Sequence, residues 1–463
     1  MWKSIAGWVS RRVRAERSRL VSGRTDWGKL VSAAKVDALL TELGVRVRDC
    51  RYSPLVTLWT FLSQVLSPDH SCREAVAKLR AFLSRDGQAP CDPDTSPYCK
   101  ARQRLPEKLC AGLALDVGGA LHERVRDARL LGGRPIKIVD GSTVSMPDTP
   151  ANQRAYPQAK TQKHGLGFPI ARIVGVLSLA SGAAVDLAIG RYKGKQTGET
   201  ALFRQLWSRF CRGDVVVGDR YFASFWDLAL LAARGIDSVY RQHHLRLTQE
   251  QRIRRLGPDD FLLCLPKPQR PAWMNRRTYA SLPAELVVRE VEVQVRQRGF
   301  RVQQLTLVTT LLDPAQYSAD ELATVYRARW HAELDLRSIK ITMQMDVLRC
   351  KTPAMVRKEI WMHLLAYNLI RTVMADAAQW QDCQPRALSF KATLQTLSAY
   401  RPLVETAAPD ALPALYEELL AAVACHRVGH RPDRYEPRAI KRRPKPHDLL
   451  TVPRKEAKRH LVA

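Results

Sequence analysis

Asp214-Val215-Val216-Val217-Gly218-Asp219 is a run of three valines and a glycine enclosed by two aspartates. A short apolar run without alternation, rich in β-branched residues, is typical of a strand that is buried on both faces of a parallel sheet. An earlier run, Ile136-Lys137-Ile138-Val139, leads in the same way into Asp140-Gly141. We therefore expect two buried strands, each ending at an aspartate.

Further β-type runs and helical patterns surround these two strands. Ala171 to Leu179 and Ala183 to Gly190 follow the first strand with little between them, as the strands of a meander would. Gly198 to Phe210 and Ser224 to Ala233 have helical patterns, and Asp237 to Tyr240 is another strand. The order β, β, β, α, β, α, β is the framework of a ribonuclease-H-like fold, although other mixed folds share pieces of it. We expect an α/β protein of this kind.

A β insertion at about residues 246–312 is expected to delay the next helix. It contains alternating runs, Glu285 to Gln297 and Gly299 to Thr310, that predict paired strands. The helical pattern resumes at Ser318-Ala319-Asp320-Glu321, which has the form of a capping box.

The charge of the chain favours a polyanionic partner. Its 463 residues contain 74 Lys and Arg against 45 Asp and Glu, so the net charge is 74 − 45 = +29. Each phosphate that such a protein neutralises on DNA releases counterions, which makes nucleic acid the leading expected partner. With 46% hydrophobic residues and ten tryptophans the chain should fold and not remain disordered.

Cysteine usage and hydropathy favour a soluble, cytoplasmic protein. The ten cysteines include no Cys-x-x-Cys pair, so we expect reduced, mostly buried thiols. No apolar run approaches the roughly 18 residues that span a bilayer. We therefore expect no membrane partner.

The N-terminal part reads as a helical DNA-binding module. Ser71-Cys72-Arg73-Glu74 has the form of a capping box, and a second short helix after Pro97 carries Lys100, Arg102 and Arg104. Two helices of which the second is basic suit a DNA-binding element. The alternative, a basic surface helix that enters no groove, stays open.

Four side chains share one face of the later helix. Tyr326, Arg329, Glu333 and Lys340 fall within an arc of about 60° when each residue turns the helix by roughly 100°. One carboxylate among three phosphate-seeking side chains suits an enzyme that cuts a nucleic-acid backbone. The alternative is the solvated face of a charged helix.

Three carboxylates are candidates for one metal-dependent site. Two-metal phosphodiester chemistry needs acids that converge from separate elements, because each ion must keep positions open for water and phosphate. Asp140 and Asp219 end expected strands, and Glu333 lies on the later helix. Asp214 begins its strand instead, and Asp335 points away from Glu333 on the helix.

The segments Val139-Asp140-Gly141-Ser142, Gly218-Asp219-Arg220-Tyr221-Phe222 and Tyr326-x2-Arg329-x3-Glu333-x6-Lys340 resemble the DDE transposases of bacterial insertion sequences. Within that family they are similar to the insertion-sequence-four branch, which is marked by a Tyr-Arg-Glu-Lys signature. The resemblance extends from about residue 50 to about residue 450. It implies a ribonuclease-H-like catalytic domain with a β insertion before the glutamate helix.

The resemblance also implies roles for the residues of these motifs. Asp140, Asp219 and Glu333 would be the catalytic acids and would hold two Mg²⁺ ions, for which Mn²⁺ can substitute. The residues that would hold DNA phosphates near the cut are Tyr326, Arg329 and Lys340. The expected activity is cut-and-paste transposition, with metal-dependent hydrolysis at terminal inverted repeats followed by strand transfer.

The implied partners are double-stranded DNA, both inverted repeats and target, and a second copy of the chain in a homodimeric synaptic complex. A bacterial cytoplasm, in association with the nucleoid, is the implied location. A hairpin at the transposon end is usual in this branch, with an aromatic of the insertion stacking on a flipped base. Trp273 is the tryptophan of the insertion, and its alternative role is packing within a small β module.

Two rival functions remain open at this point. A domesticated, non-catalytic DNA-binding protein would have no physical need for converging carboxylates, and a hydrolytic nuclease would cut without joining strands. The expected domains are a helical DNA-binding region at 1–130, the catalytic domain at 131–400, a helical C-terminal region at 401–430 and a basic tail at 431–463.

Overall fold

The computed structural model describes residues 31–47, 50–85, 87–243, 248–294, 304–408, 410–429 and 448–460. The chain divides into two compact units that are discontinuous in sequence. The helical unit comprises Met1–Arg126, Ala180–Asp186 and Leu334–Val428, and the sheet unit comprises Asp127–Leu179, Leu187–Glu333 and Gly429–Ala463. Of the expected basic tail, residues 431–447 and 461–463 lie outside the described residues.

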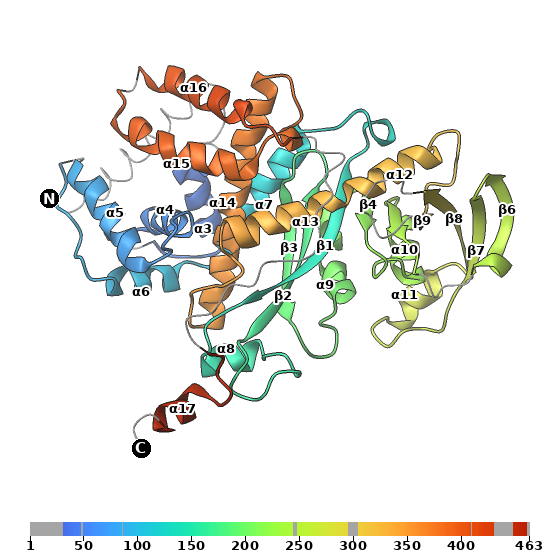
Figure 1. Cartoon of the computed structure of the whole chain (residues 1–463), viewed down its shortest axis with the longest axis horizontal. Helices are drawn as coiled ribbons and strands as arrows, with labels where there is room; N and C mark the ends of the chain where they lie inside the picture. The colour runs from blue at the N-terminus through green and yellow to red at the C-terminus, as the bar shows by residue number, and fades with distance from the viewer. Residues whose placement is uncertain are drawn as a thin grey trace. The chain divides into compact units, whose positions relative to one another are not determined.

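A nine-stranded sheet forms the framework of the sheet unit. The strands are β1 (Ile136–Ser145), β2 (Ile170–Ser178), β3 (Ala184–Arg191), β4 (Val215–Gly218), β5 (Asp237–Arg241), β6 (Arg252–Gly257), β7 (Asp260–Pro266), β8 (Glu285–Gln294) and β9 (Gln304–Thr309). Their order is β3-β2-β1-β4-β5-β9-β8-β7-β6 (Figure 1). β1 is parallel to β4 and β4 to β5, whereas β2 and β9 run antiparallel to β1 and β5.

The two apolar runs of the sequence form the buried centre of this sheet. Val215, Val216 and Val217 are fully buried in β4, as are Ile138 and Val139 in β1. These strands are apolar on both faces because both faces are covered. The valine run therefore predicted strand β4 correctly.

One buried ion pair joins β1 to the start of β4. The Lys137 ammonium is 2.5 Å from Asp214 Oδ2 and donates to the Arg209 carbonyl at 2.8 Å. Because both side chains are almost fully buried, each charge depends on the other for compensation. Asp214 is therefore used in a structural ion pair, and Asp219 is the aspartate at the end of β4.

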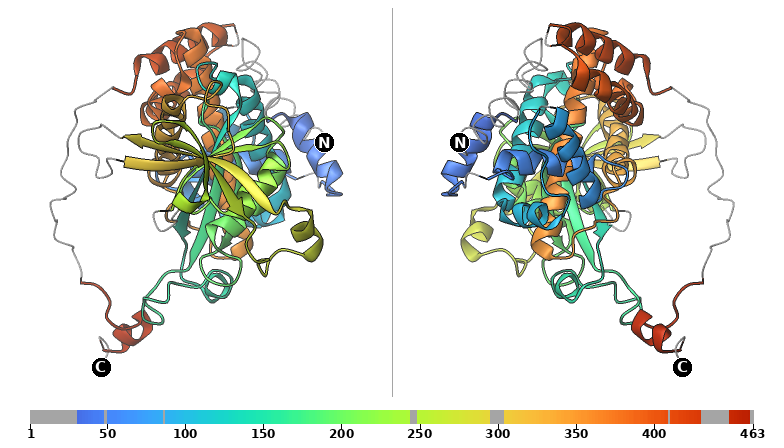
Figure 2. Two further views of the ribbon diagram at one scale, coloured as in Figure 1. Left: turned by 90° about the vertical axis from the view of Figure 1, so that its right-hand side faces the viewer. Right: turned by 90° about the vertical axis from the view of Figure 1, so that its left-hand side faces the viewer.

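The segment between β5 and the helix that begins at Ala319 adds four strands to the same sheet. β8 and β9 pair antiparallel, and β7 and β6 continue the sheet beyond them (Figure 2, left). The fully buried Arg289 holds β7 and β8 together, because its guanidinium forms two hydrogen bonds to Asp260, at 2.8 and 2.6 Å, and a third to the Tyr317 carbonyl.

Short helices accompany the sheet. They are α8 (Pro150–Ala155), α9 (Glu199–Gln205), α10 (Phe225–Ala232), α11 (Arg276–Ser281), α12 (Ala319–Ala328), α13 (Trp330–Arg337) and α17 (Arg454–His460). At the start of α12 the Ser318 side chain accepts from the Glu321 amide, as the capping box predicts. The Glu321 carboxylate instead accepts from the Leu131 amide at 2.6 Å, so it fastens the helix to the chain before β1.

The helical unit is organised around one long helix. Its helices are α3 (Ala33–Glu42), α4 (Pro54–Val65), α5 (Cys72–Arg85), α6 (Ser96–Arg104), α7 (Glu107–Arg124), α14 (Pro353–Trp380), α15 (Phe390–Thr406) and α16 (Leu412–Cys425). α14 packs against α4, α7, α15 and α16. Its buried Asn368 donates to the carbonyls of Ala114 and Ala184, so an internal amide satisfies backbone groups of two segments.

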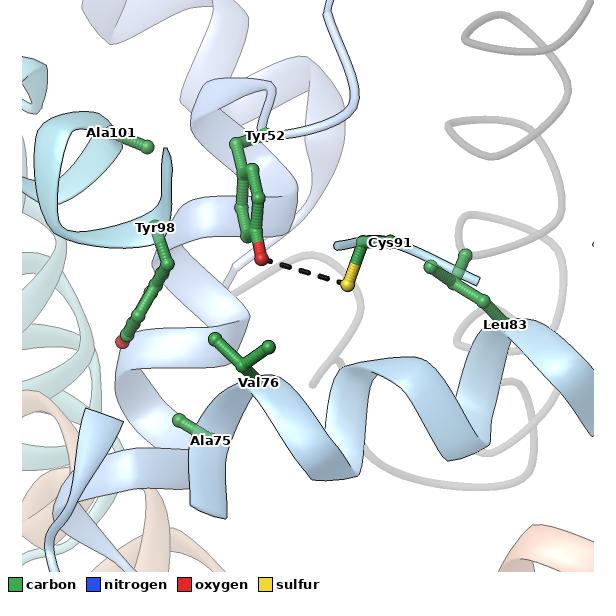
Figure 3. Close-up of a cluster of buried hydrophobic side chains, with 7 residues drawn as sticks. All are labelled: Tyr52, Ala75, Val76, Leu83, Cys91, Tyr98 and Ala101. Carbon is green, nitrogen blue, oxygen red and sulfur yellow. Dashed lines mark hydrogen bonds between the residues drawn. The ribbon is translucent and has the colours of Figure 1, made fainter. Parts of the chain in front are cut away.

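A separate apolar cluster holds α5 and α6 together with Tyr52, which lies just before α4. It consists of Tyr52, Ala75, Val76, Leu83, Cys91, Tyr98 and Ala101 (Figure 3). The Tyr52 hydroxyl lies 3.6 Å from Cys91 Sγ, which gives this buried phenol a polar partner. In the described part of the chain, none of the helices has the length and apolarity required to cross a membrane.

Candidate active site

The register of β1 and β4 brings two aspartates to the same level of the sheet. The parallel ladder pairs Ile138 with Val217, and two residues further along each strand stand Asp140 and Asp219. Residues two apart on a strand project from the same face. The ladder therefore directs both carboxylates to one place.

Asp140 does not end its strand, contrary to the sequence-based expectation. β1 continues to Ser145, because it stays paired with β2 as far as Ile170 after its pairing with β4 has ended at Ile138. Asp140 thus lies within β1, just beyond the β4 ladder. Asp219 directly follows the last residue of β4, as expected, and its Oδ1 accepts from the Tyr221 amide at 2.8 Å.

Electrostatics show that Glu333 belongs to the same group. Burial raises the pKa of Asp140 to about 6, and the carboxylates of Asp219 and Glu333 add to this rise. The Arg329 guanidinium and a hydrogen bond from the Gly141 amide to Asp140, of 2.9 Å, act in the opposite direction. The carboxylates at the end of β4 and on α13 therefore both act on Asp140 of β1.

Arg329 lies among these acids. Its Nη2 is 2.9 Å from Glu333 Oε1, and its Nη1 is 3.7 Å from Asp140 Oδ2. The guanidinium carbon is 5.9 Å from the centre of the Tyr326 ring, and Tyr326 itself is buried. Burial raises the pKa of the Tyr326 phenol, and Arg329 opposes that shift.

The signature segment is not one regular helix. α12 ends at Ala328, α13 runs from Trp330 to Arg337, and a π-helical turn over Ser338–Thr342 carries Lys340. A rotation of roughly 100° per residue therefore no longer applies between Glu333 and Lys340. Within the sheet unit the structure groups Tyr326, Arg329 and Glu333 with the two aspartates; Lys340 belongs to the helical unit.

Carboxylates are suitable ligands for a divalent cation, but these side chains do not form a complete ligand set. Among the described residues, no three acidic, His or Cys side chains are close enough to form a complete ligand set. The donors are nevertheless carboxylate oxygens, which Mg²⁺ prefers. Burial is the main cause of the raised pKa of Asp140, and the like charges of Asp219 and Glu333 add to it; a bound cation would oppose the contribution of these charges.

Sequence reasoning missed one acid beside this group. Glu199, the first residue of α9, packs against Gly141 and interacts electrostatically with Asp219. The position of Glu199 in the sequence could have identified it, because this carboxylate stands at a helix start immediately after the basic loop Lys193–Gly198.

Comparison with known proteins agrees with this geometry. Residues 131–369, which contain all three acids, match the family model described as "Transposase DDE domain". The chain belongs to the DDE transposase family. The chain is also 26% identical over 429 residues to "Transposase InsG for insertion sequence element IS4" of Escherichia coli (strain K12), a match that covers 91% of this chain and 92% of that protein. The expected membership is thus confirmed, and the full-length match agrees with the insertion-sequence-four branch.

Two other relatives are more limited matches. A segment of 81 residues, 18% of this chain, is 35% identical to "Transposase for insertion sequence element IS421" of Escherichia coli, covering 21% of that protein. The cryo-EM structure of a piggyBac transposase synaptic complex with hairpin DNA has a TM-score of 0.41 and 8% identity, over 88% of this chain and 85% of that one. As a DDE transposase the protein is a DNA-binding transposition enzyme, and such enzymes generally use divalent metal ions.

The three basic residues of α6 in this transposase do not act together. Lys100 and Arg104 are exposed, but Arg102 is buried. The Arg102 guanidinium donates to Gln64 Oε1 at 3.2 Å and to Cys72 Sγ at 3.1 Å. The expectation that Arg102 contacts DNA is therefore corrected: its charge is used inside the helical unit.

Trp273 of the transposase lies in the loop before α11 and is half-buried. The Arg204 guanidinium covers its ring at 3.8 Å from the centroid. Arg204 is held in turn by two hydrogen bonds to the buried Asp227, of 2.7 and 3.0 Å. The tryptophan is thus packed on a fixed cation, which is compatible with its alternative role in the β module.

Proposed function

We propose that this transposase moves its element by cut and paste, hydrolysing DNA at terminal inverted repeats and then transferring the freed strand to a target. The observation that supports this most directly is the register that places Asp140 and Asp219 at one level of the sheet, within electrostatic reach of Glu333. The strand order β3-β2-β1-β4-β5 also supports a ribonuclease-H-like catalytic domain.

In this proposal Asp140, Asp219 and Glu333 hold Mg²⁺, and Mn²⁺ can replace it. When bound, the ions would stabilise charge on the phosphate and lower the pKa of water. The protein's own contribution is positioning. Asp140 and Asp219 stand two residues beyond Ile138 and Val217, the last pair of the β1–β4 ladder, and Glu333 accepts a hydrogen bond from Arg329 at 2.9 Å.

The basic side chains are proposed to hold the DNA. Arg329 presents a planar fork that matches two phosphate oxygens, and the buried Tyr326 ring lies beneath it. Lys340 is proposed to contact a phosphate near the cut, Lys100 and Arg104 to contact DNA from α6, and Trp273 to stack on a flipped base. We further propose that two copies form the synaptic complex, in a bacterial cytoplasm close to the nucleoid.

The first prediction tests the three acids. Asp140→Asn, Asp219→Asn and Glu333→Gln should each abolish nicking of DNA that carries the flanking repeats in the presence of Mg²⁺. Binding to the same DNA should stay nearly unchanged, because phosphate contacts dominate affinity. Glu250→Gln, which alters an exposed acid in the sheet unit, is the matched control.

The same assay separates the rival functions. Wild-type nicking in any of the three acid variants would remove that acid from the site. A wild-type protein that binds repeats but never cuts in Mg²⁺ or Mn²⁺ is a domesticated DNA-binding protein. One that cuts, yet fails to join pre-cleaved ends to a target plasmid, is a hydrolytic nuclease.

A further inference from the structure

Two cysteine sulfurs lie side by side in the helical unit. Cys72 is the first residue of α5, Cys99 lies in α6, and their Sγ atoms are 3.8 Å apart. Both are free thiols. A disulfide bond has a sulfur–sulfur length of about 2.05 Å, so the two sulfurs need to approach by less than roughly 2 Å to form one. The fold therefore brings two thiols almost to bonding distance.

Arg102 contacts both sulfurs with the same nitrogen. Its Nη2 lies 3.1 Å from Cys72 Sγ and 3.6 Å from Cys99 Sγ. Its Nη1 donates to Gln64 Oε1 at 3.2 Å, and the Gln64 amide nitrogen lies 3.7 Å from Cys72 Sγ. The arginine is buried, and its guanidinium lies over the Tyr98 ring at 4.9 Å from the centroid. A fixed cation therefore holds the two sulfurs next to each other.

The surroundings of the pair allow it to react. The thiolate is the form of cysteine that attacks an oxidant, and a neighbouring arginine stabilises that form. Burial raises the pKa of Cys72, and the Arg102 cation opposes this shift. Because burial is the larger influence, Cys72 is mostly a thiol near neutral pH and reacts slowly. Neither cysteine is fully buried, so a small oxidant can reach the pair.

We propose that Cys72 and Cys99 are a modification site, a dithiol that hydrogen peroxide converts into an intramolecular disulfide between α5 and α6. One thiolate attacks the peroxide, so that a sulfur–oxygen bond forms, the oxygen–oxygen bond breaks and hydroxide leaves. The second thiolate attacks this sulfenic acid, so that the sulfur–sulfur bond forms and a second hydroxide leaves. The two thiol protons convert both hydroxides to water, and two electrons pass from the sulfurs to the peroxide.

The disulfide would close residues 73–98 into a loop that contains the rest of α5 and the connection to α6. A cross-link restricts the unfolded chain, so the oxidised protein should resist unfolding better than the reduced protein. In a reducing cytoplasm the pair would stay reduced, and it would form the link only when peroxide accumulates. The inference goes beyond the proposed transposition, because both cysteines belong to the helical unit and the three acids to the sheet unit.

The test is peptide mapping of the full-length protein under non-reducing conditions, after dilute folded protein has been treated with hydrogen peroxide. The wild type should yield two peptides joined through Cys72 and Cys99, which dithiothreitol separates. Cys72→Ser and Cys99→Ser should each lack this product. Cys211→Ser removes an exposed thiol of the sheet unit and should form the link as the wild type does.

Protein that is unfolded in urea before the treatment should give a mixture of cysteine pairs, because the fold no longer selects one. Oxidation of Cys72 or Cys99 in the folded protein without the joined peptides would overturn the proposal. A disulfide from either residue to a different cysteine would overturn it too.

Urea unfolding supplies a second measurement. The midpoint of the oxidised wild type should be higher than that of the reduced wild type and should return to the reduced value after dithiothreitol. Cys72→Ser should have the same midpoint with and without peroxide. Equal midpoints for the linked and the reduced wild type would show that the disulfide does not fasten α5 to α6.

Discussion

At the scale of single residues, Arg329 compensates the negative charge of the active-site carboxylates. The half-buried carboxylates of Asp219 and Glu333 act as like charges on Asp140, and the Arg329 guanidinium contacts Glu333 and Asp140 at 2.9 and 3.7 Å. The same side chain is the strongest opposing influence on the raised pKa of Asp140. Arg329 thus compensates the carboxylates in the protein alone and presents a phosphate-binding fork to DNA.

Replacing Arg329 by Ala should lower the rate of cleavage and flatten the salt dependence of repeat binding by about one unit of slope, because one phosphate contact is lost. Arg329→Lys should retain the slope but not the full rate, since an ammonium has no planar fork. Filter binding across a range of salt concentrations measures the slope. An unchanged slope with full activity would place Arg329 on an ordinary solvated helix face.

A buried histidine makes the helical unit sensitive to acid. His363 is fully buried on α14, its ring centroid lies 5.5 Å from that of His70, and neither ring nitrogen has a hydrogen-bond partner among the described residues. Burial, with a smaller contribution from His70, lowers the pKa of His363 to about 3. The unfolded chain would bind a proton here near pH 6.5 that the folded chain rejects.

The contribution of neutral His363 to the free energy of unfolding should therefore be fully present above pH 6.5. It should fall as the pH drops from 6.5 towards 3. This one group accounts for about 2 kcal/mol lost at pH 5. His363→Leu should make urea-unfolding midpoints less dependent on pH between 8 and 5. If the variant and the wild type lose stability in parallel over that range, His363 is not the cause.

At the scale of elements, α6 divides its basic residues between two tasks. Lys100 and Arg104 are four residues apart and share the exposed face, whereas Arg102 points inwards to Gln64 and Cys72. Arg102 also stacks on the Phe61 and Tyr98 rings at 5.0 and 4.9 Å. A single helix thus stabilises the unit with one face and offers charge with the other.

The double change Lys100→Ala and Arg104→Ala should reduce discrimination for the repeat over unrelated DNA and leave the melting temperature unchanged. Arg102→Ala should do the reverse and lower the melting temperature by several degrees, since it removes a buried cation together with its hydrogen bonds to Gln64 and Cys72. Competition binding measures the discrimination for the repeat, and thermal melts measure the melting temperature. A melt of Arg102→Ala identical to that of the wild type would contradict the buried role.

Much of the structure of these helices and strands could be predicted from the sequence. The valine run of β4 predicted a buried strand, and a spacing of two residues on a helix already separates Arg102 from Lys100 by roughly 200°. The length of β1 was not predictable, because its continuation beyond Asp140 depends on the partner strand β2. The π-helical turn at Lys340 and the approach of Glu199 to Gly141 likewise depend on packing between distant segments.

At the scale of the whole molecule, the net charge of +29 supplies binding that does not depend on sequence. The C-terminal part contributes to it through α17, which carries Arg454, Lys455, Lys458 and Arg459. Pro453, just before α17, lies against Gly165 of the same unit, 3.2 Å from where a side chain of that glycine would begin.

Deleting residues 431–463 should weaken binding to repeat and to unrelated DNA by the same factor, because the positive charge of the segment attracts phosphates whatever the base sequence. Gel-shift titrations on both DNAs at two salt concentrations measure this factor. Loss of the repeat footprint alone, with non-specific binding intact, would place sequence readout in the C-terminal part of the chain.

The pairing of Ile138 with Val217 has a consequence for how this gene can change over time. Each added or deleted codon between Val215 and Asp219 would slide one strand past the other by a residue and turn the second aspartate to the opposite face. Length changes in the loops that join the strands of the insertion would leave that alignment untouched. Descendants of this element should therefore vary freely in the length of the insertion while β4 keeps its length to the residue.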